Sequence, residues 1–139
     1  EKLSSNDIPV TTLYAPVIPC INDHEMESII KATSDAGARH ADYILLRLPF
    51  EVKTLFIEWL ETHYPLKAKH VLSIIMQCRD GKAYDSDFGS RMSGAGAYAN
   101  MLKKRFELAC RKNRVNGRQA VRLNCELFRR GNKDQLTLF

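Results

Sequence analysis

Arginines and glycines near two predicted loops are the residues of this sequence best placed to bind an anion. Arg47 interrupts an apolar run just before that run ends, and a cation in such a place must reach water, a carboxylate or a ligand. We expect Arg47 to contact a ligand or substrate, or else to form an ion pair with Asp42 or Glu51. Arg91 lies among the glycines of residues 89–96, whose backbone N–H groups can bind an anion at the start of the next helix. An ordered loop without a ligand is the alternative for this segment.

The cysteines do not form a metal-binding motif. Four are present, and no two of them are spaced as C-x-x-C. Because each lies among apolar neighbours, we expect reduced, mostly buried thiols at Cys20, Cys78, Cys110 and Cys125. The glycine-rich loop is followed by no Gly-Lys-Ser/Thr, which excludes a P-loop, and the predicted helix before it excludes a dinucleotide fingerprint.

The positive charge lies in the C-terminal part of the chain. The net charge is +5, but residues 1–99 hold ten Lys/Arg against thirteen Asp/Glu (−3), whereas residues 100–139 hold eleven against three (+8). Such a segment suits a phosphate backbone, although a solvated helix face is the commoner reason for clustered lysines and arginines. The candidate contacts to nucleic acid or another anionic substrate are Arg91, Lys103, Lys104 and Arg111.

The chain ends on an apolar pentapeptide that follows a polar segment. Residues 131–134 are polar, and the last residues are Gln135-Leu136-Thr137-Leu138-Phe139. Large apolar side chains at a terminus are costly to expose, so we expect them to dock on another surface. Docking onto their own domain is the alternative to docking on a separate partner.

Two apolar runs that end at prolines are predicted to be neighbouring parallel strands. The first begins at Val10 and stops at Pro16 and Pro19, because proline fixes its own φ and favours extended backbone before it. The second, residues 41–49, alternates too little for a half-exposed strand, so we expect it to be buried on both faces. A helix between them makes a βαβ unit with a right-handed crossover. Ligands of α/β proteins bind at the carboxyl ends of such strands.

The helix between the two strands has start and stop signals. Asn22 or Asp23 can cap it, with Glu25 in capping-box register after Asn22. Gly37 is the expected left-handed stop. The predicted inward face consists of Met26, Ile29, Ile30 and Thr33.

Further amphipathic segments follow the second strand. From Phe50 an apolar stripe predicts a helix that covers the sheet through Val52, Leu55, Phe56, Trp59 and Leu60. A helix from about Leu66 to Gly81 is predicted to bury Val71, Leu72, Ile75 and Cys78. The helix of residues 96–112 is predicted to bury Tyr98, Leu102, Phe106 and Ala109 and to direct Lys103, Lys104, Arg105, Arg111 and Lys112 outward or to its end. Residues 118–130 are a short amphipathic piece.

Length and composition predict one α/β domain. A chain of 139 residues is long enough to bury a core. No apolar run reaches the length of a membrane span and the N-terminus has no signal-peptide pattern, so we expect a cytoplasmic protein without membrane contact. Because a strand arrives so soon after Glu1, we interpret the start of the sequence as a cut edge.

Several separated segments resemble one enzyme family. Residues 16–25, Pro-Val-Ile-Pro-Cys-Ile-Asn-Asp-His-Glu, resemble the fifth-strand segment of radical S-adenosylmethionine (SAM) enzymes. Together with residues 43–53, the Tyr-Asp-Ser of residues 84–86 and the last five residues, essentially the whole chain is similar to the C-terminal half of bacterial radical SAM proteins related to spore photoproduct lyase, often labelled DNA repair photolyases.

The resemblance implies a fold and a division of the chain. The fold would be the C-terminal portion of a partial (β/α)6, TIM-like barrel, with two parallel strands and covering helices, followed by a basic helical extension. Residues 1–80 would be the last βαβα units of that barrel. Residues 81–130 would be a glycine- and aspartate-containing loop and the basic extension, and residues 131–139 a polar linker and tail.

The resemblance also implies cofactor-binding positions. The family's SAM-supporting pattern G-x-I-x-G-x-x-E falls here on Pro16, Ile18, Cys20 and Asp23, of which only Ile18 matches outright. Cys20 stands where glycine is usual. The second strand would contact the adenine of SAM at Tyr43, Leu45 and Arg47.

The iron–sulfur motif of the family is absent from this sequence. The family holds a [4Fe-4S] cluster with C-x-x-x-C-x-x-C in its N-terminal half, and that spacing does not occur here. We therefore expect this chain to be part of a longer enzyme, with the missing N-terminal half as its partner, and to hold neither cofactor alone. In the complete enzyme the cluster would pass an electron to SAM, and the 5′-deoxyadenosyl radical would abstract hydrogen from a substrate.

The C-terminal pentapeptide resembles the one by which bacterial polymerases and repair proteins bind the sliding clamp. In that resemblance Gln135 bonds the rim, while an apolar pocket takes Leu136, Leu138 and Phe139. This partner and the basic segment favour work near DNA. Two alternatives to an enzyme half stay open, namely a non-catalytic module that binds nucleic acid or the clamp, and a scaffold.

Overall fold

The architecture is α/β, with a two-stranded sheet and helices that follow the predicted order. The computed structural model describes residues 1–79, 81, 91–117 and 126. Its elements are two 3-10 turns (Ser4–Asn6 and Asp23–Glu25), β1 (Thr11–Val17), α1 (Met26–Asp35), β2 (His40–Leu45), α2 (Val52–His63), α3 (Ala68–Gln77) and α4 (Gly96–Lys112). The predicted helix of residues 96–112 is therefore confirmed, and the second strand ends earlier than predicted.

The two strands are parallel neighbours, as the sequence predicts. Thr11 pairs with His40 and Tyr14 with Tyr43, and the register shifts before the next pair, Val17 with Leu45. Helix α1 connects the strands, so β1, α1 and β2 form the expected βαβ unit.

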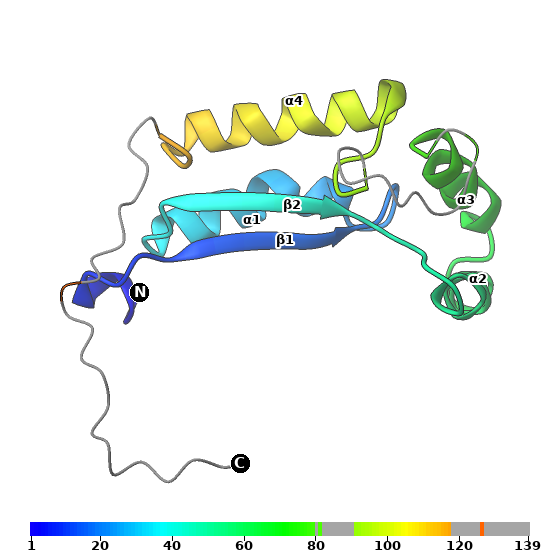
Figure 1. The fold of residues 1–139 in the computed structure, drawn as a ribbon, viewed down its shortest axis with the longest axis horizontal. Coiled ribbons are helices and arrows are strands. Elements are labelled where there is room, and N and C mark those ends of the chain that lie inside the picture. The colour runs from blue at the N-terminus through cyan, green and yellow to red at the C-terminus, as the bar shows by residue number, and fades with distance from the viewer. Residues whose placement is uncertain (80, 82–90, 118–125, 127–139) are drawn as a thin grey trace, which may run out of the picture.

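The sheet is covered on one face only within the described residues. Figure 1 shows α1 and α4 lying along the strands, and both helices pack onto the face that carries Tyr14, Tyr43 and Leu45. On the other face Leu13 is 58% exposed and Asp42 is exposed. The prediction that the second strand is buried on both faces is wrong, because successive side chains of a strand point to opposite faces and no described helix covers the second face.

Helices α2 and α3 do not cover the sheet. They lie past the carboxyl ends of the strands (Figure 1) and form a separate core in which Leu60 packs with Leu48 and Val71. Of the predicted inward stripe only Leu60 is buried, whereas Leu55 is 63% exposed. The prediction for this helix is wrong because an apolar stripe shows that a helix has a packing face but does not show which element it meets.

Helix α1 begins later than predicted. Residues 23–25 form a 3-10 turn, α1 starts at Met26, and the Asn22 side chain makes no cap hydrogen bond. The capping-box prediction is therefore wrong, because the Asn22 amide is used in the preceding loop. The predicted stop is confirmed, since Gly37 adopts a φ of 95° directly after the helix.

Candidate functional site

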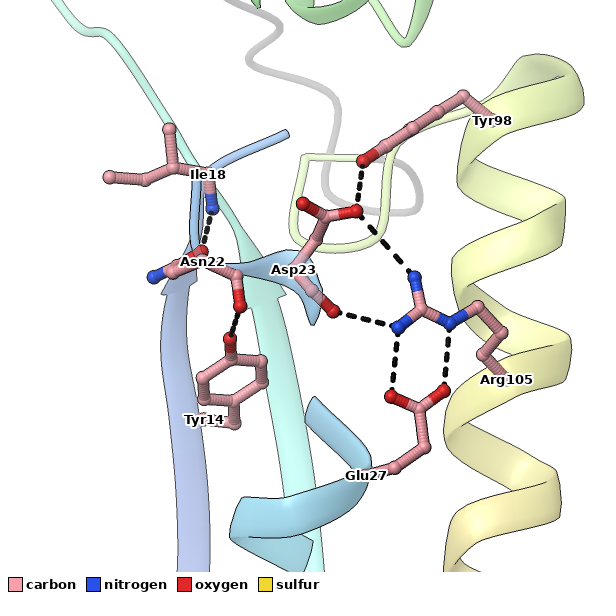
Figure 2. A network of polar contacts seen from close by, with 7 residues as sticks. All are labelled: Tyr14, Ile18, Asn22, Asp23, Glu27, Tyr98 and Arg105. Carbon is pink, nitrogen blue, oxygen red and sulfur yellow. Dashed lines mark hydrogen bonds and ion pairs between the residues drawn. The ribbon is translucent and has the colours of Figure 1, made fainter. Parts of the chain in front are cut away.

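Asn22 organises the loop at the carboxyl end of β1. Its Oδ1 accepts a hydrogen bond from the Ile18 backbone N–H at 2.7 Å, and its Nδ2 donates to the Pro16 carbonyl oxygen at 3.0 Å. The Tyr14 hydroxyl donates to the Asn22 carbonyl oxygen (Figure 2). Burial raises the pKa of Tyr14 to about 12, with further contributions from the nearby carboxylates Glu25 and Asp23, so this hydroxyl keeps its proton. The loop is thus closed by both side chains.

Arg105 and Tyr98 of α4 hold the next residues in place. The Arg105 guanidinium makes two 2.8 Å hydrogen bonds to the Glu27 carboxylate, and it donates to the Asp23 carbonyl oxygen at 2.9 Å. It also lies 3.5 Å from Asp23 Oδ2, to which the Tyr98 hydroxyl donates at 2.8 Å (Figure 2). The prediction that Arg105 faces outward is wrong, because these acceptors draw it onto α1.

The charges of this network are mutually stabilised. The hydrogen bond from Arg105 lowers the pKa of Glu27. Burial, with the Asp23 hydrogen bond in addition, raises the pKa of Tyr98, so this hydroxyl is a donor rather than an acid. The network of Arg105, Tyr98, Asp23 and Glu27 therefore holds the start of α1 and the loop before it against α4.

The four cofactor positions implied by the resemblance do not share one environment. Pro16 is exposed, and Ile18 is half-buried against the α2–α3 core. Cys20 is half-buried, and burial raises the pKa of its thiol, which favours the neutral form. The Asp23 carboxylate points toward α4 and has two partners there, as Figure 2 shows. Pro16 is therefore part of β1, Ile18 and Cys20 lie in the loop after it, and Asp23 contacts α4.

Cys20 has an unusual backbone conformation. Its φ is 59°, in the left-handed region that glycine adopts readily and other residues seldom do. Its carbonyl oxygen accepts a hydrogen bond from Lys67 Nζ at 3.2 Å. The chain thus uses a glycine-like backbone at the position where the resemblance expects glycine.

At the carboxyl end of β2, the backbone groups of the candidate residues have protein partners. The Tyr43 N–H donates to the Asp42 carboxylate at 2.8 Å, and the Leu45 N–H donates to the Met92 carbonyl oxygen at 2.8 Å. Arg47 is half-buried, with Nη1 4.0 Å from the sulfur of Met92. Tyr43 and Leu45 are buried, so Arg47 is the candidate of these three whose side chain is partly exposed.

Arg79 was not predicted to take part in this region. It is only 2% exposed and donates to the carbonyl oxygens of Leu46 at 3.1 Å, Leu45 at 3.3 Å and Arg91 at 2.8 Å. An arginine directly after a buried cysteine in an amphipathic helix was the available sequence signal. Arg79 ties the end of β2 to the segment before α4.

The basic candidates lie in two places. Lys103, Lys104 and Arg111 are exposed on α4, and Lys104 and Arg111 are two turns apart on one side of it. Arg91 is half-buried ahead of the helix. Three of the four basic candidates therefore lie on α4, and Arg91 lies in the segment before it.

Some predictions fall outside the described residues. They concern residues 82–90 of the predicted loop and residues 118–125, which include Cys125. They also concern the tail residues Gln135, Leu136, Leu138 and Phe139. Within the described ranges, no group of three or more His, Cys, Asp or Glu side chains can hold a metal ion. No helix in those ranges is long and apolar enough to cross a membrane.

Comparisons with known proteins were negative. No protein-family model, no curated protein and no solved structure matches the chain.

Proposed function

We propose that this chain is the C-terminal part of a radical SAM enzyme related to spore photoproduct lyase, and that it encloses SAM and substrate. The observation that carries this proposal is the pair of adjacent parallel strands, on which the helices described by the structure pack against one face. Purely parallel sheets are nearly always covered on both faces or closed into barrels. A barrel wall has helices outside and strand side chains inside, which matches the position of α1 and α4 and the exposure of Leu13.

Cys20 supports the same proposal. The family pattern calls for glycine where this chain has Cys20, and a φ of 59° is the conformation for which glycine is normally used. The family pattern and Cys20 thus agree in backbone conformation, although they differ in residue type. This agreement favours a common loop shape at the end of β1.

The residues of this chain fit the enclosure of SAM and do not fit the cluster. The loop after β1 offers the half-buried side chains of Ile18 and Cys20, and Arg47 lies two residues past the end of β2. Cys78 and Cys110 are buried, and no described group can hold a metal. The proposal assigns the cluster ligands to the N-terminal half of the longer enzyme. When bound, SAM and the cluster supply the radical chemistry, while this chain positions the cofactor and excludes water.

The proposal is tested on the longer protein, reconstituted anaerobically with iron and sulfide. It predicts cluster absorbance and SAM turnover. Arg47→Gln is expected to weaken SAM turnover, whereas Lys53→Gln, on the exposed side of α2, is expected to leave it unchanged. A reconstituted protein that shows neither cluster absorbance nor SAM turnover would refute the proposal.

A second candidate function is a non-catalytic module that binds nucleic acid or the sliding clamp. The exposure of Lys103, Lys104 and Arg111 on α4 favours it. It predicts DNA affinity that falls steeply with salt, and a lower salt slope in Lys104→Gln/Arg111→Gln. Deletion of residues 135–139 is expected to abolish clamp binding measured by calorimetry. DNA affinity that does not depend on salt would contradict this function.

A further inference from the structure

A surface groove runs between α1 and α4, the two helices that pack on the sheet (Figure 1). Its volume is about 400 Å³, and it is lined by Glu27 and Lys31 of α1 and by Leu108, Ala109 and Lys112 of α4. We call it the α1–α4 groove. Because Leu108 is 59% exposed, the groove presents an apolar side chain to the solvent.

Contacts between the two helices fix both ends of the groove. At one end the Arg105 guanidinium of α4 makes two 2.8 Å hydrogen bonds to the Glu27 carboxylate of α1 (Figure 2). At the other end the Ser34 hydroxyl of α1 donates to the Asn113 carbonyl oxygen at 2.8 Å. The helices therefore run side by side in the same direction, with about two turns between these contacts. Such a groove suits one face of a further helix.

The outer side of α4 carries large apolar side chains that its own core does not use. Leu108 is 59% exposed and Met101, two turns before it, is 40% exposed. The buried face of α4 is formed by other residues, Leu102 and Phe106 among them. Packing on the sheet therefore does not account for Leu108 and Met101. Exposed apolar side chains with a polar rim are typical of interaction sites.

Positive side chains lie on both sides of Leu108. Lys104 is one turn before it and Lys112 one turn after it, and both are exposed. In the part of the chain that the structure describes, neither lysine takes part in an ion pair. The surface thus offers one apolar side chain between two available cations.

The carboxylates near the groove do not cancel this charge. Glu27 is bonded by Arg105, and Asp35 is bonded by Lys31. Glu107 is next to Leu108 in the sequence, but successive residues of a helix do not face the same way, and Glu107 does not line the groove. The uncompensated charge at the groove is therefore positive, and it complements an acidic partner.

The floor of the groove favours a protein helix over nucleic acid. It consists of the aliphatic residues Leu108 and Ala109, whereas proteins that bind single strands stack the bases on aromatic side chains. A duplex is bound through its phosphates, which leucine cannot contact favourably. A helix with a leucine, and with carboxylates four residues before and after it, matches Lys104, Leu108 and Lys112 residue by residue.

We propose that the α1–α4 groove binds an acidic amphipathic helix of a separate protein. This helix places an aliphatic residue on Leu108 and carboxylates opposite Lys104 and Lys112. The proposal uses α1 and α4 alone, so it does not depend on the radical SAM assignment. It gives Lys104 a protein partner in place of the nucleic acid of the second candidate function.

Binding of a synthetic peptide to the 139-residue chain tests the proposal. The probe is a fluorescently labelled helical peptide of about four turns, with leucines along one face and glutamates one turn to either side of them. By fluorescence anisotropy we expect a Kd on the order of 10 μM and weaker binding as salt is added. The same peptide with glutamine in place of every glutamate is expected to bind at least about tenfold more weakly.

Variants of the groove are expected to lose this binding. Leu108→Gln removes the apolar contact, and Lys104→Glu/Lys112→Glu reverses the charge on both sides of it. Each is expected to raise the Kd of the glutamate peptide at least about tenfold. All three positions are exposed, so the circular dichroism spectrum is expected to stay unchanged.

Matched control variants lie on α2 and α3. Leu55→Gln makes the same substitution at a leucine that is 63% exposed on α2. Lys53→Glu/Lys69→Glu makes the same change in net charge at exposed positions of α2 and α3. Both controls are expected to bind the glutamate peptide as the unmodified chain does.

Several outcomes would overturn the proposal. One is a glutamate peptide that does not bind, and another is binding that Leu108→Gln leaves unchanged or that the control variants lose equally. Binding of a short DNA duplex that Leu108→Gln abolishes would assign the groove to nucleic acid instead. A dimer of the chain in sedimentation that Leu108→Gln dissociates would assign it to a second copy.

Discussion

Replacing Arg105 by alanine tests whether α4 fixes the loop after β1. The substitution removes both 2.8 Å hydrogen bonds to Glu27, the 2.9 Å bond to the Asp23 carbonyl oxygen and the 3.5 Å ion pair with the Asp23 carboxylate. Tyr98 remains as the hydrogen-bond donor to Asp23. The variant therefore leaves a mostly buried carboxylate with one donor and no cation.

The expected loss of stability follows from the exposure of each partner. The Glu27 side chain is 47% exposed, so its half of the network contributes only about 0.5 kcal/mol. The Asp23 side chain is 14% exposed, and its lost charge-assisted contacts cost about 1.5 kcal/mol. We expect Arg105→Ala to lower the free energy of unfolding by about 2 kcal/mol at pH 7.

Urea unfolding of Arg105→Ala and of the control Lys104→Ala gives the measurement. Because Arg105 lowers the pKa of Glu27 in the folded chain, this contribution is present above the unfolded pKa of glutamate and is lost as the pH falls through the lower folded value. The difference between the unmodified chain and Arg105→Ala is therefore expected to shrink in acid. A loss at pH 7 no larger than that of Lys104→Ala would refute the role assigned to Arg105.

Substitutions at three further positions test the loops by chemical denaturation. Cys20→Gly relieves a φ of 59° and is expected to be close to neutral, whereas Cys20→Val is expected to cost at least about 1 kcal/mol, and equal effects would contradict the left-handed conformation. Asn22→Ala removes the bonds to Ile18 and Pro16 and is expected to cost about 2 kcal/mol, so a loss under about 0.5 kcal/mol would contradict its role. Gly94→Ala places a Cβ 2.8 Å from Leu45 Cδ2 at a φ of 73° and is expected to cost about 2 kcal/mol, while Gly117→Ala meets nothing within 4 Å and serves as its control.

The parts of the fold that were predictable are those with local signals. The apolar run that ends at prolines predicts β1, and the spacing of Leu102, Phe106 and Ala109 predicts the buried face of α4. Gly37 marks the end of α1 because only a left-handed residue suits that position. Each of these signals depends on residues close together in the sequence, so the sequence alone reveals it.

The candidate site depends on contacts between distant residues. In the sequence Arg105 is one of several cations of a basic helix. The packing of α4 on α1 brings it to Asp23 and Glu27. Asn116 reads as a loop residue, yet it bonds Ala41, far earlier in the chain. Asparagine is a common helix cap, but the Asn22 side chain bonds the Ile18 N–H and the Pro16 carbonyl oxygen instead of capping α1. The type of a residue and its spacing in the sequence do not determine which of several possible partners its side chain bonds.

The proposed radical SAM function requires that this chain belong to a longer enzyme with a cluster-binding N-terminal half. Iron and sulfide analysis of the longer protein after anaerobic reconstitution tests that proposal. We expect a C-x-x-x-C-x-x-C motif in the N-terminal half and about four iron atoms per chain. A longer protein that lacks this motif and binds no iron would show that the proposal is wrong.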